Sequence, residues 1–183
     1  MDDTTTPVKW KMESEALRPD SDIAKTLLVS WKCALWSDPD RQRLAKMLSD
    51  LEDHYPRLAE LNTACEQEGF SLLSVAASMG RDVMCRHLIN SEVNVEFHGI
   101  LNGPDPLWAG RGAALYVAAA AGHLEVVQLL VEQGARLDAK GTMRMWNGST
   151  YVMVEDRPPY DVAQAFSHPQ VADFLKARES HTD

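Results

Sequence analysis

Apolar and small residues recur along this chain with helical spacing, in two-helix units that end at turn residues. In the clearest unit, residues 115–121 are small, and residues 124–132 carry an apolar stripe at the spacing of one helix face. Gly122 and His123 separate the two segments, and Gly134 follows where a helix end needs a positive φ. This pattern predicts two antiparallel helices that pack closely together.

The same unit occurs three times. Gly80 lies 42 residues before Gly122, and His168 lies 45 residues after His123, with apolar positions in the same order around each. These segments resemble ankyrin repeats: two clear repeats at about 69–95 and 112–139, and a degenerate repeat at 158–178. The positions of the family's T-P-L-H opening depart from the consensus in all three, at 71–74, 113–116 and 158–161.

The resemblance implies an all-α solenoid, an ankyrin-type stack of about four helix pairs. The helical spacing before the repeats predicts an N-terminal capping pair, whose second helix should end by Tyr55-Pro56. Arg57–Leu61 should add one further turn of helix. We therefore expect four parts: a flexible tail at 1–20, a capping pair at 21–62, an ankyrin-repeat domain at 63–178 and a C-terminal tail at 179–183.

The repeat spacing exceeds the family period of about 33 residues, and the excess lies in two inserts, 96–111 and 140–157. In ankyrin arrays these linkers are β-hairpin fingers, so the resemblance implies two elongated fingers. Asn147-Gly148 is a strong signal for a two-residue hairpin turn, which would pair Arg144 with Tyr151. Two prolines in the first insert favour a compact loop over a regular ladder.

The fingers are the predicted interaction site, because they combine arginine with aromatic residues, as binding hot spots do. Alternation places Arg144, Trp146, Tyr151 and Met153 on one side of the second finger, and Met143, Met145, Val152 and Val154 on the other. The alternative is that the second finger only packs on the neighbouring repeat. The first finger contributes Phe97, Trp108 and Arg111, of which Trp108 fits a packed loop anchor equally well. From the concave face that the resemblance implies, Ser78, Met79 and Tyr116 are added.

Composition and charge limit the class of protein, the kinds of partner and the compartment. The chain has 183 residues, 45% hydrophobic and 25% charged, as an ordinary globular domain does, and its net charge is −9. No basic stripe points to nucleic acid, and no apolar run approaches the length of a membrane span. Cys33, Cys65 and Cys85 are an odd and scattered set, which predicts reduced thiols and an intracellular protein, cytoplasmic or nuclear.

No short motif predicts catalysis. The cysteines lack zinc-ligand spacing, and no phosphate-binding loop or nucleophile motif occurs. We therefore expect no catalytic residue, no metal and no cofactor. His123 and His168 are expected to be structural, with each ring bonded to the backbone of an adjoining loop.

The leading hypothesis is a non-catalytic adaptor or scaffold that binds a partner protein through its fingers and concave groove. The acidic net charge supports an alternative, a chaperone or escort for a basic client. A third hypothesis is the N-terminal module of a larger assembly, and an enzyme is the least favoured. Self-association through the fingers is also open.

Overall fold

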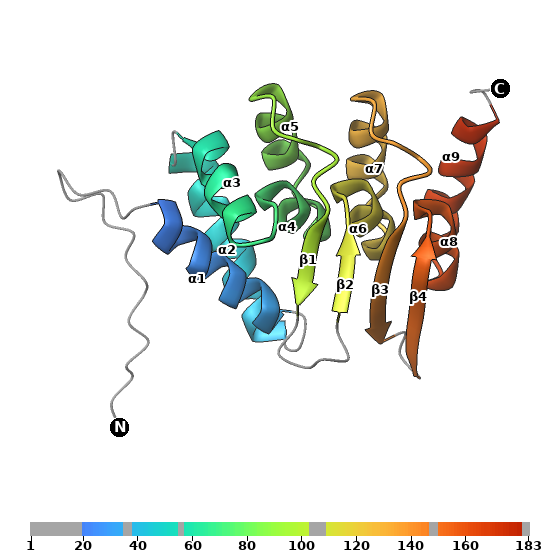
Figure 1. The fold of residues 1–183 in the computed structure, drawn as a ribbon, viewed down its shortest axis with the longest axis horizontal. Helices are drawn as coiled ribbons and strands as arrows, with labels where there is room; N and C mark the ends of the chain where they lie inside the picture. The colour runs from blue at the N-terminus through green and yellow to red at the C-terminus, as the bar shows by residue number, and fades with distance from the viewer. Residues whose placement is uncertain (1–19, 35–37, 55–56, 103–108, 147–149, 181–183) are drawn as a thin grey trace.

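The computed structural model describes residues 20–34, 38–54, 57–102, 109–146 and 150–180. Within them, the helices stack in a row and four strands lie side by side along one edge of the stack (Figure 1). The helices are α1 (Asp20–Ala34), α2 (Asp38–His54), α3 (Leu58–Gln67), α4 (Leu72–Ser78), α5 (Asp82–Asn90), α6 (Ala114–Ala121), α7 (Leu124–Glu132), α8 (Pro159–Ala165) and α9 (Pro169–Glu179). The strands are β1 (Gly99–Asn102), β2 (Ala109–Gly112), β3 (Gly141–Trp146) and β4 (Tyr151–Arg157).

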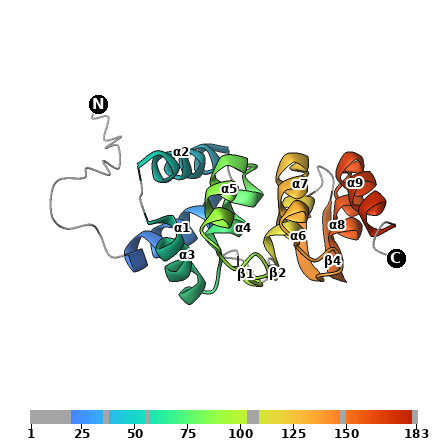
Figure 2. The ribbon, with the colours of Figure 1, turned by 90° about the horizontal axis from the view of Figure 1, so that it is seen from above.

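The three predicted repeats form helix pairs, α4 with α5, α6 with α7, and α8 with α9. The first helices α4, α6 and α8 pack against one another in sequence, and the second helices α5, α7 and α9 form a parallel row (Figure 2). Buried alanines on α6, such as Ala118 and Ala119, allow this close packing. The helices predicted over 115–121 and 124–132 are confirmed to within one residue at their starts.

The N-terminal end differs from the prediction. Helix α2 stops at His54, as expected, but α3 is a ten-residue helix rather than one extra turn. Leu58, Leu61 and Cys65 of α3 are buried, and the helix packs against α1 and α4. Their spacing is a full helical stripe that continues past Leu61, which is why α3 runs on. The N-terminal group therefore has three helices. Of the tail predicted at 1–20, Asp20 is the first residue of α1, and residues 1–19 lie outside the described residues.

A buried asparagine ties α3 to the first repeat. Asn62 Oδ1 accepts hydrogen bonds from Ser71 Oγ at 3.2 Å and from the Leu73 backbone N–H at 3.4 Å. Ser71 in turn caps α4, because its Oγ accepts from the Ser74 N–H at 3.3 Å. This network secures the start of α4 where the chain departs from the family's T-P-L-H opening.

The first finger is a hairpin, so the expectation of a compact loop was wrong for its base. β1 and β2 pair antiparallel from Gly99↔Gly112 to Asn102↔Ala109, and β2 joins β3 through the single pair Arg111↔Thr142. The two prolines fall in 103–108, which lies between the strands and outside the described residues, so they do not interrupt the ladder.

The second finger is also a hairpin, but its register differs from the prediction. Trp146 pairs with Tyr151, and Arg144 pairs with Met153 instead of Tyr151. Four residues, not two, separate the paired ends Trp146 and Tyr151, and the predicted turn Asn147-Gly148 lies outside the described residues. Because side chains alternate with period two, a shift of two residues leaves each position on its predicted face.

The inner face of the sheet, which is turned toward the helices, packs against the ring of Tyr116. A Cβ built on Gly112 would lie 2.6 Å from Tyr116 Cδ1, and one built on Gly141 would lie 2.6 Å from both Cγ and Cδ1 of the same ring. Further out on this face, Met143 and Val154 are buried. The sheet therefore presses its inner face onto the helices, and glycine is required where the strands pass the Tyr116 ring.

At two successive junctions between repeats, a histidine ring of one repeat packs against a glycine of the repeat before it. Gly122 has φ of 78°, and a Cβ there would clash with Nδ1 of His168. His168 Nε2 lies 3.0 Å from the Ala120 carbonyl oxygen. The same contact occurs one repeat earlier, where His123 sits over Gly80. Both histidines bond backbone, as expected, but the carbonyls belong to the last turn of the preceding repeat's first helix, Ser78 of α4 and Ala120 of α6, and not to a loop.

Gly141→Ala tests the contact with Tyr116. The added methyl cannot fit against the ring without displacing the strand or the helix, so we expect a loss of about 1–3 kcal/mol in the free energy of unfolding. Urea denaturation followed by circular dichroism measures it. In a double-mutant cycle with Tyr116→Leu, the second change should relieve part of the cost. Additive losses would show that the ring does not cause the clash.

The half-buried ring of His123 should make the stability of the helix stack sensitive to acid. Burial, and next in size among the lowering effects the charge of His168, lower the pKa of His123, although its bond to the Ser78 carbonyl opposes them. The unfolded chain therefore takes up this proton at higher pH than the folded chain, so stability falls as pH drops through about 6.5. Between pH 7.5 and 5.5 the wild type should lose more stability than His123→Gln in urea titrations. Equal losses would contradict this.

Candidate interaction surface

The outer face of the finger sheet carries three of the predicted contact residues. Arg144 and Met153 are cross-strand partners, and Arg111 is exposed on β2, where it pairs with Thr142. Met153 is 49% exposed, whereas its neighbour Val154 on the inner face is buried. We call Arg111, Arg144 and Met153 the outer sheet face. The structure thus brings together residues of both fingers that lie more than 30 positions apart in the sequence.

The aromatic residues predicted for this face are only partly described. The backbone register pairs Trp146 with Tyr151 at the outer end of the hairpin, while their side chains, and all of Trp108, lie outside the described residues. Phe97 is half-buried in the turn before β1, where its N–H donates to the Asn94 carbonyl oxygen at 3.2 Å. Their role as contact residues stays a prediction.

The predicted concave-face residues are less accessible than expected. Tyr116 is fully buried beneath the finger strands, so it is not available to a partner and its assignment as a contact residue was wrong. Ser78 and Met79 are half-buried. Ser78 Oγ donates to the Val75 carbonyl oxygen at 2.8 Å, and its own carbonyl accepts from His123 at 3.1 Å. The elongated fingers cover Tyr116, which period counting alone does not reveal.

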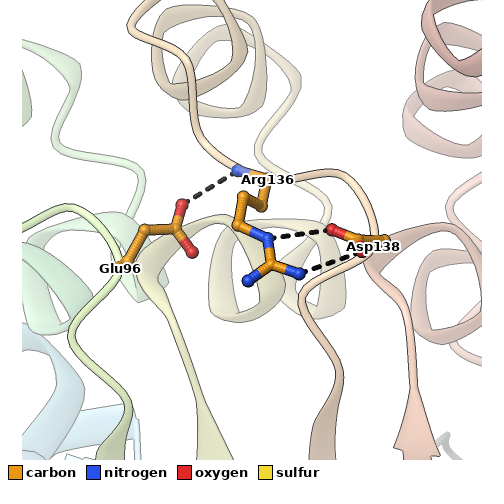
Figure 3. Close-up of polar contacts among 3 residues, drawn as sticks. All are labelled: Glu96, Arg136 and Asp138. Carbon is orange, nitrogen blue, oxygen red and sulfur yellow. Dashed lines mark hydrogen bonds and ion pairs between the residues drawn. The ribbon is translucent and has the colours of Figure 1, made fainter. Parts of the chain in front are cut away.

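A network of polar contacts that the sequence pattern did not predict, here called the brace, joins the two linkers above the sheet. Glu96 Oε1 accepts from the Arg136 backbone N–H at 2.9 Å, while the Arg136 guanidinium donates to both oxygens of Asp138 at 3.1 and 3.0 Å (Figure 3). The hydrogen bond from Arg136 lowers the pKa of Asp138. Glu96 and Asp138 are 42 residues apart, the repeat spacing, which was the available signal.

An open groove lies beyond the last strand, between β4 and α8, and it was also missed. Six residues line it: Met153, Val154, Glu155, Arg157, Asp161 and Ala165. Two of these lining residues form an ion pair, with Arg157 Nη1 and Asp161 Oδ2 3.7 Å apart. We call this surface the β4–α8 groove. It faces the position that a further repeat would occupy.

The described residues show little material for metal or thiol chemistry. Among them, no three His, Cys, Asp or Glu side chains lie close enough to hold a metal ion. Cys65 and Cys85 are free and buried. Burial, followed by the charge of Asp82, raises the pKa of Cys85 to about 12, and burial likewise raises the pKa of Cys65, so both remain protonated thiols at neutral pH. In the described part of the chain, no helix has both the length and the apolar character needed to cross a bilayer.

A comparison with protein families gives one match: three copies of ankyrin repeats, over residues 18–141. The chain belongs to the ankyrin repeat family. The matched region includes α1 to α3, which precede the first clear repeat, and ends where the second finger begins. Helices α8 and α9 lie beyond it and nevertheless continue the stack. No curated protein sequence matches the chain. Ankyrin repeats generally mediate protein–protein interaction and are typically not enzymes. This array differs from ordinary ankyrin arrays in its long finger sheet.

Tyr116→Phe tests whether the buried hydroxyl has a structural role. Tyr116 Oη is buried and has no hydrogen-bond partner among the described residues. We therefore expect Phe to change the free energy of unfolding by less than about 1 kcal/mol, whereas Tyr116→Ala should cost roughly 3–5 kcal/mol through lost packing. Chemical denaturation compares the two variants. A large loss in Tyr116→Phe would indicate that the hydroxyl bonds a buried water.

Proposed function

We propose that this protein is a non-catalytic adaptor that binds a partner protein through the outer sheet face. The observation that carries the proposal is the division of the finger sheet. Its inner face is buried against α6 and α8, while its outer face presents Arg111, Arg144 and the half-exposed Met153. In an ordinary ankyrin repeat the fingers are short, so this additional surface is what the long inserts supply.

The chemistry of the outer sheet face favours a partner with acidic and apolar groups. Arginine offers a planar guanidinium that bonds carboxylates in a bidentate manner, and the flexible thioether of Met153 adapts to apolar surfaces. The net charge of −9 favours instead a basic client, as an escort would need, and that surface must then lie elsewhere on the stack. Added negative charge on the outer sheet face should weaken a partner with acidic groups, whereas it should not weaken a basic client.

We also propose that the protein works in a reducing compartment, the cytoplasm or the nucleus. Cys65 and Cys85 are buried, unpaired and in different helices. Buried free thiols of this kind are usual where disulfides do not form.

Charge reversal of the outer sheet face tests the adaptor proposal. Affinity capture from native lysate should retain a protein with the wild type and lose it with Arg111→Glu/Arg144→Glu. The matched control Arg43→Glu/Arg86→Glu makes the same change in net charge on exposed positions of α2 and α5. We expect the purified partner to bind the outer-face variant at least about 30-fold more weakly, or roughly 2 kcal/mol, as for hot-spot arginines.

All variants must first show unaltered thermal unfolding. Equal capture by the wild type, the outer-face variant and the control would overturn the assignment of this face. A partner that both double variants bind as well as or better than the wild type does, with affinity that falls steeply with salt, would instead support a basic client held by the acidic surface.

A further inference from the structure

The sheet ends at an exposed strand. β4 is the terminal strand in the order β1-β2-β3-β4, and at seven residues it is longer than the other edge strand, β1, which has four. No backbone hydrogen bond joins Val152–Glu155 to a segment outside the sheet within the described part of the chain. An edge strand of this kind presents a row of backbone donors and acceptors that an extended chain can satisfy.

A β-bulge sets the length of this free edge. The β3–β4 register shifts between Gly141 and Met143, and Asp156 in the bulge has φ of 50°. Its N–H donates to Thr142 Oγ1 at 3.2 Å, and Lys140 Nζ lies 3.3 Å from its carboxylate. The bulge turns the strand away beyond Glu155. Five residues, Tyr151–Glu155, are left for pairing, a length of roughly 17 Å.

The side chains beside this edge specify what an added strand must carry. Met153 is half-exposed and apolar, and Glu155, two residues further on the same side, has no ion-pair partner among the described residues. On the opposite side, Val154 and the small Ala165 of α8 offer an apolar wall. The added strand therefore needs an apolar residue opposite Met153, another opposite Val154, and a basic residue opposite Glu155.

Glu155 is the charge that we expect to select the added strand, because the other acids in or beside the β4–α8 groove have basic neighbours. Arg157 lies 3.7 Å from Asp161, and Asp156 lies 3.3 Å from Lys140, so each of these acids already has a basic neighbour. A lysine or arginine in the added strand would give Glu155 a basic neighbour as well. The groove thus favours a basic, apolar, extended segment over an acidic one.

We propose that the β4 edge binds an extended segment of a partner protein by strand addition, and that this segment carries two adjacent apolar residues next to a lysine or arginine. The backbone ladder supplies affinity, and Met153, Val154 and Glu155 supply selectivity. The inference rests on the proposed function only in that the chain binds a protein, because it uses the β4–α8 groove and not the arginines of the outer sheet face.

The probe is a synthetic peptide, acetyl-Thr-Val-Val-Lys-Val-Thr-amide, titrated into the ¹⁵N-labelled full chain and followed by amide chemical shifts. We expect saturable shifts centred on the amides of Val152–Glu155. A peptide with glutamate in place of lysine should bind at least about tenfold more weakly, and a peptide with proline in place of the second valine should not bind. Equal binding of the three peptides, or shifts centred elsewhere, would overturn the proposal.

Two variants locate the site, each with a matched control. Glu155→Lys should weaken the lysine peptide at least about tenfold and improve the glutamate peptide, whereas Glu132→Lys, the same change at an exposed position of α7, should change neither. Met153→Lys should also weaken binding, and Val83→Lys, at a residue 46% exposed on α5, should not. Unchanged affinity in both edge variants would overturn the proposal.

Further outcomes separate the sources of the strand and the two proposals. If the β4 amides shift with protein concentration alone and sedimentation shows a dimer, the occupant is a second copy of this chain and the proposal of a different partner is overturned. If Arg111→Glu/Arg144→Glu loses the captured protein while no peptide binds, the edge inference fails and the adaptor proposal stands. If the peptide binds the edge and the double variant captures every protein that the wild type captures, only the adaptor proposal fails.

Discussion

The rest of this structure depends on one repeated contact, in which the ring of His123 or His168 packs against the backbone of the preceding repeat. His168 covers Gly122 so closely that no Cβ fits, and its Nε2 meets a carbonyl oxygen of α6. His123 makes the same contact with Gly80. A positive-φ glycine ends the first helix, and a hydrogen-bonded ring sets the distance to the next repeat. Together they fix the spacing and angle at which repeats stack.

The finger sheet follows from this spacing. Once the repeats stand at a fixed separation, their linkers lie close enough for β2 and β3 to pair, although only Arg111 and Thr142 do so. The linkers are further held by the brace in which Glu96 accepts from the Arg136 N–H. Two hairpins that would be unstable as isolated two-stranded ribbons become one sheet with a buried inner face. Stacking therefore creates the surface that the long inserts extend.

The same geometry decides which groups remain for recognition. Tyr116, at a position expected to face a ligand, fills the space between the strands and α6 and becomes part of the core. Recognition is left to the outer sheet face and to the edge of β4, the last strand of the described sheet. An exposed edge is a hazard for aggregation, and the bulge at Asp156 with its neighbouring charges limits it to a short stretch.

The sequence by itself determined the repeats. Gly80, Gly122 and His168, together with the apolar stripes around them, fixed the helix pairs, because helical periodicity and left-handed helix ends are local properties of the chain. Alternation also assigned the two faces of the second finger. Tertiary structure decided the rest: the register of the hairpins, the burial of Tyr116 and the free edge of β4. These features depend on which segments, distant in sequence, come to lie side by side. A local sequence pattern does not determine such long-range contacts.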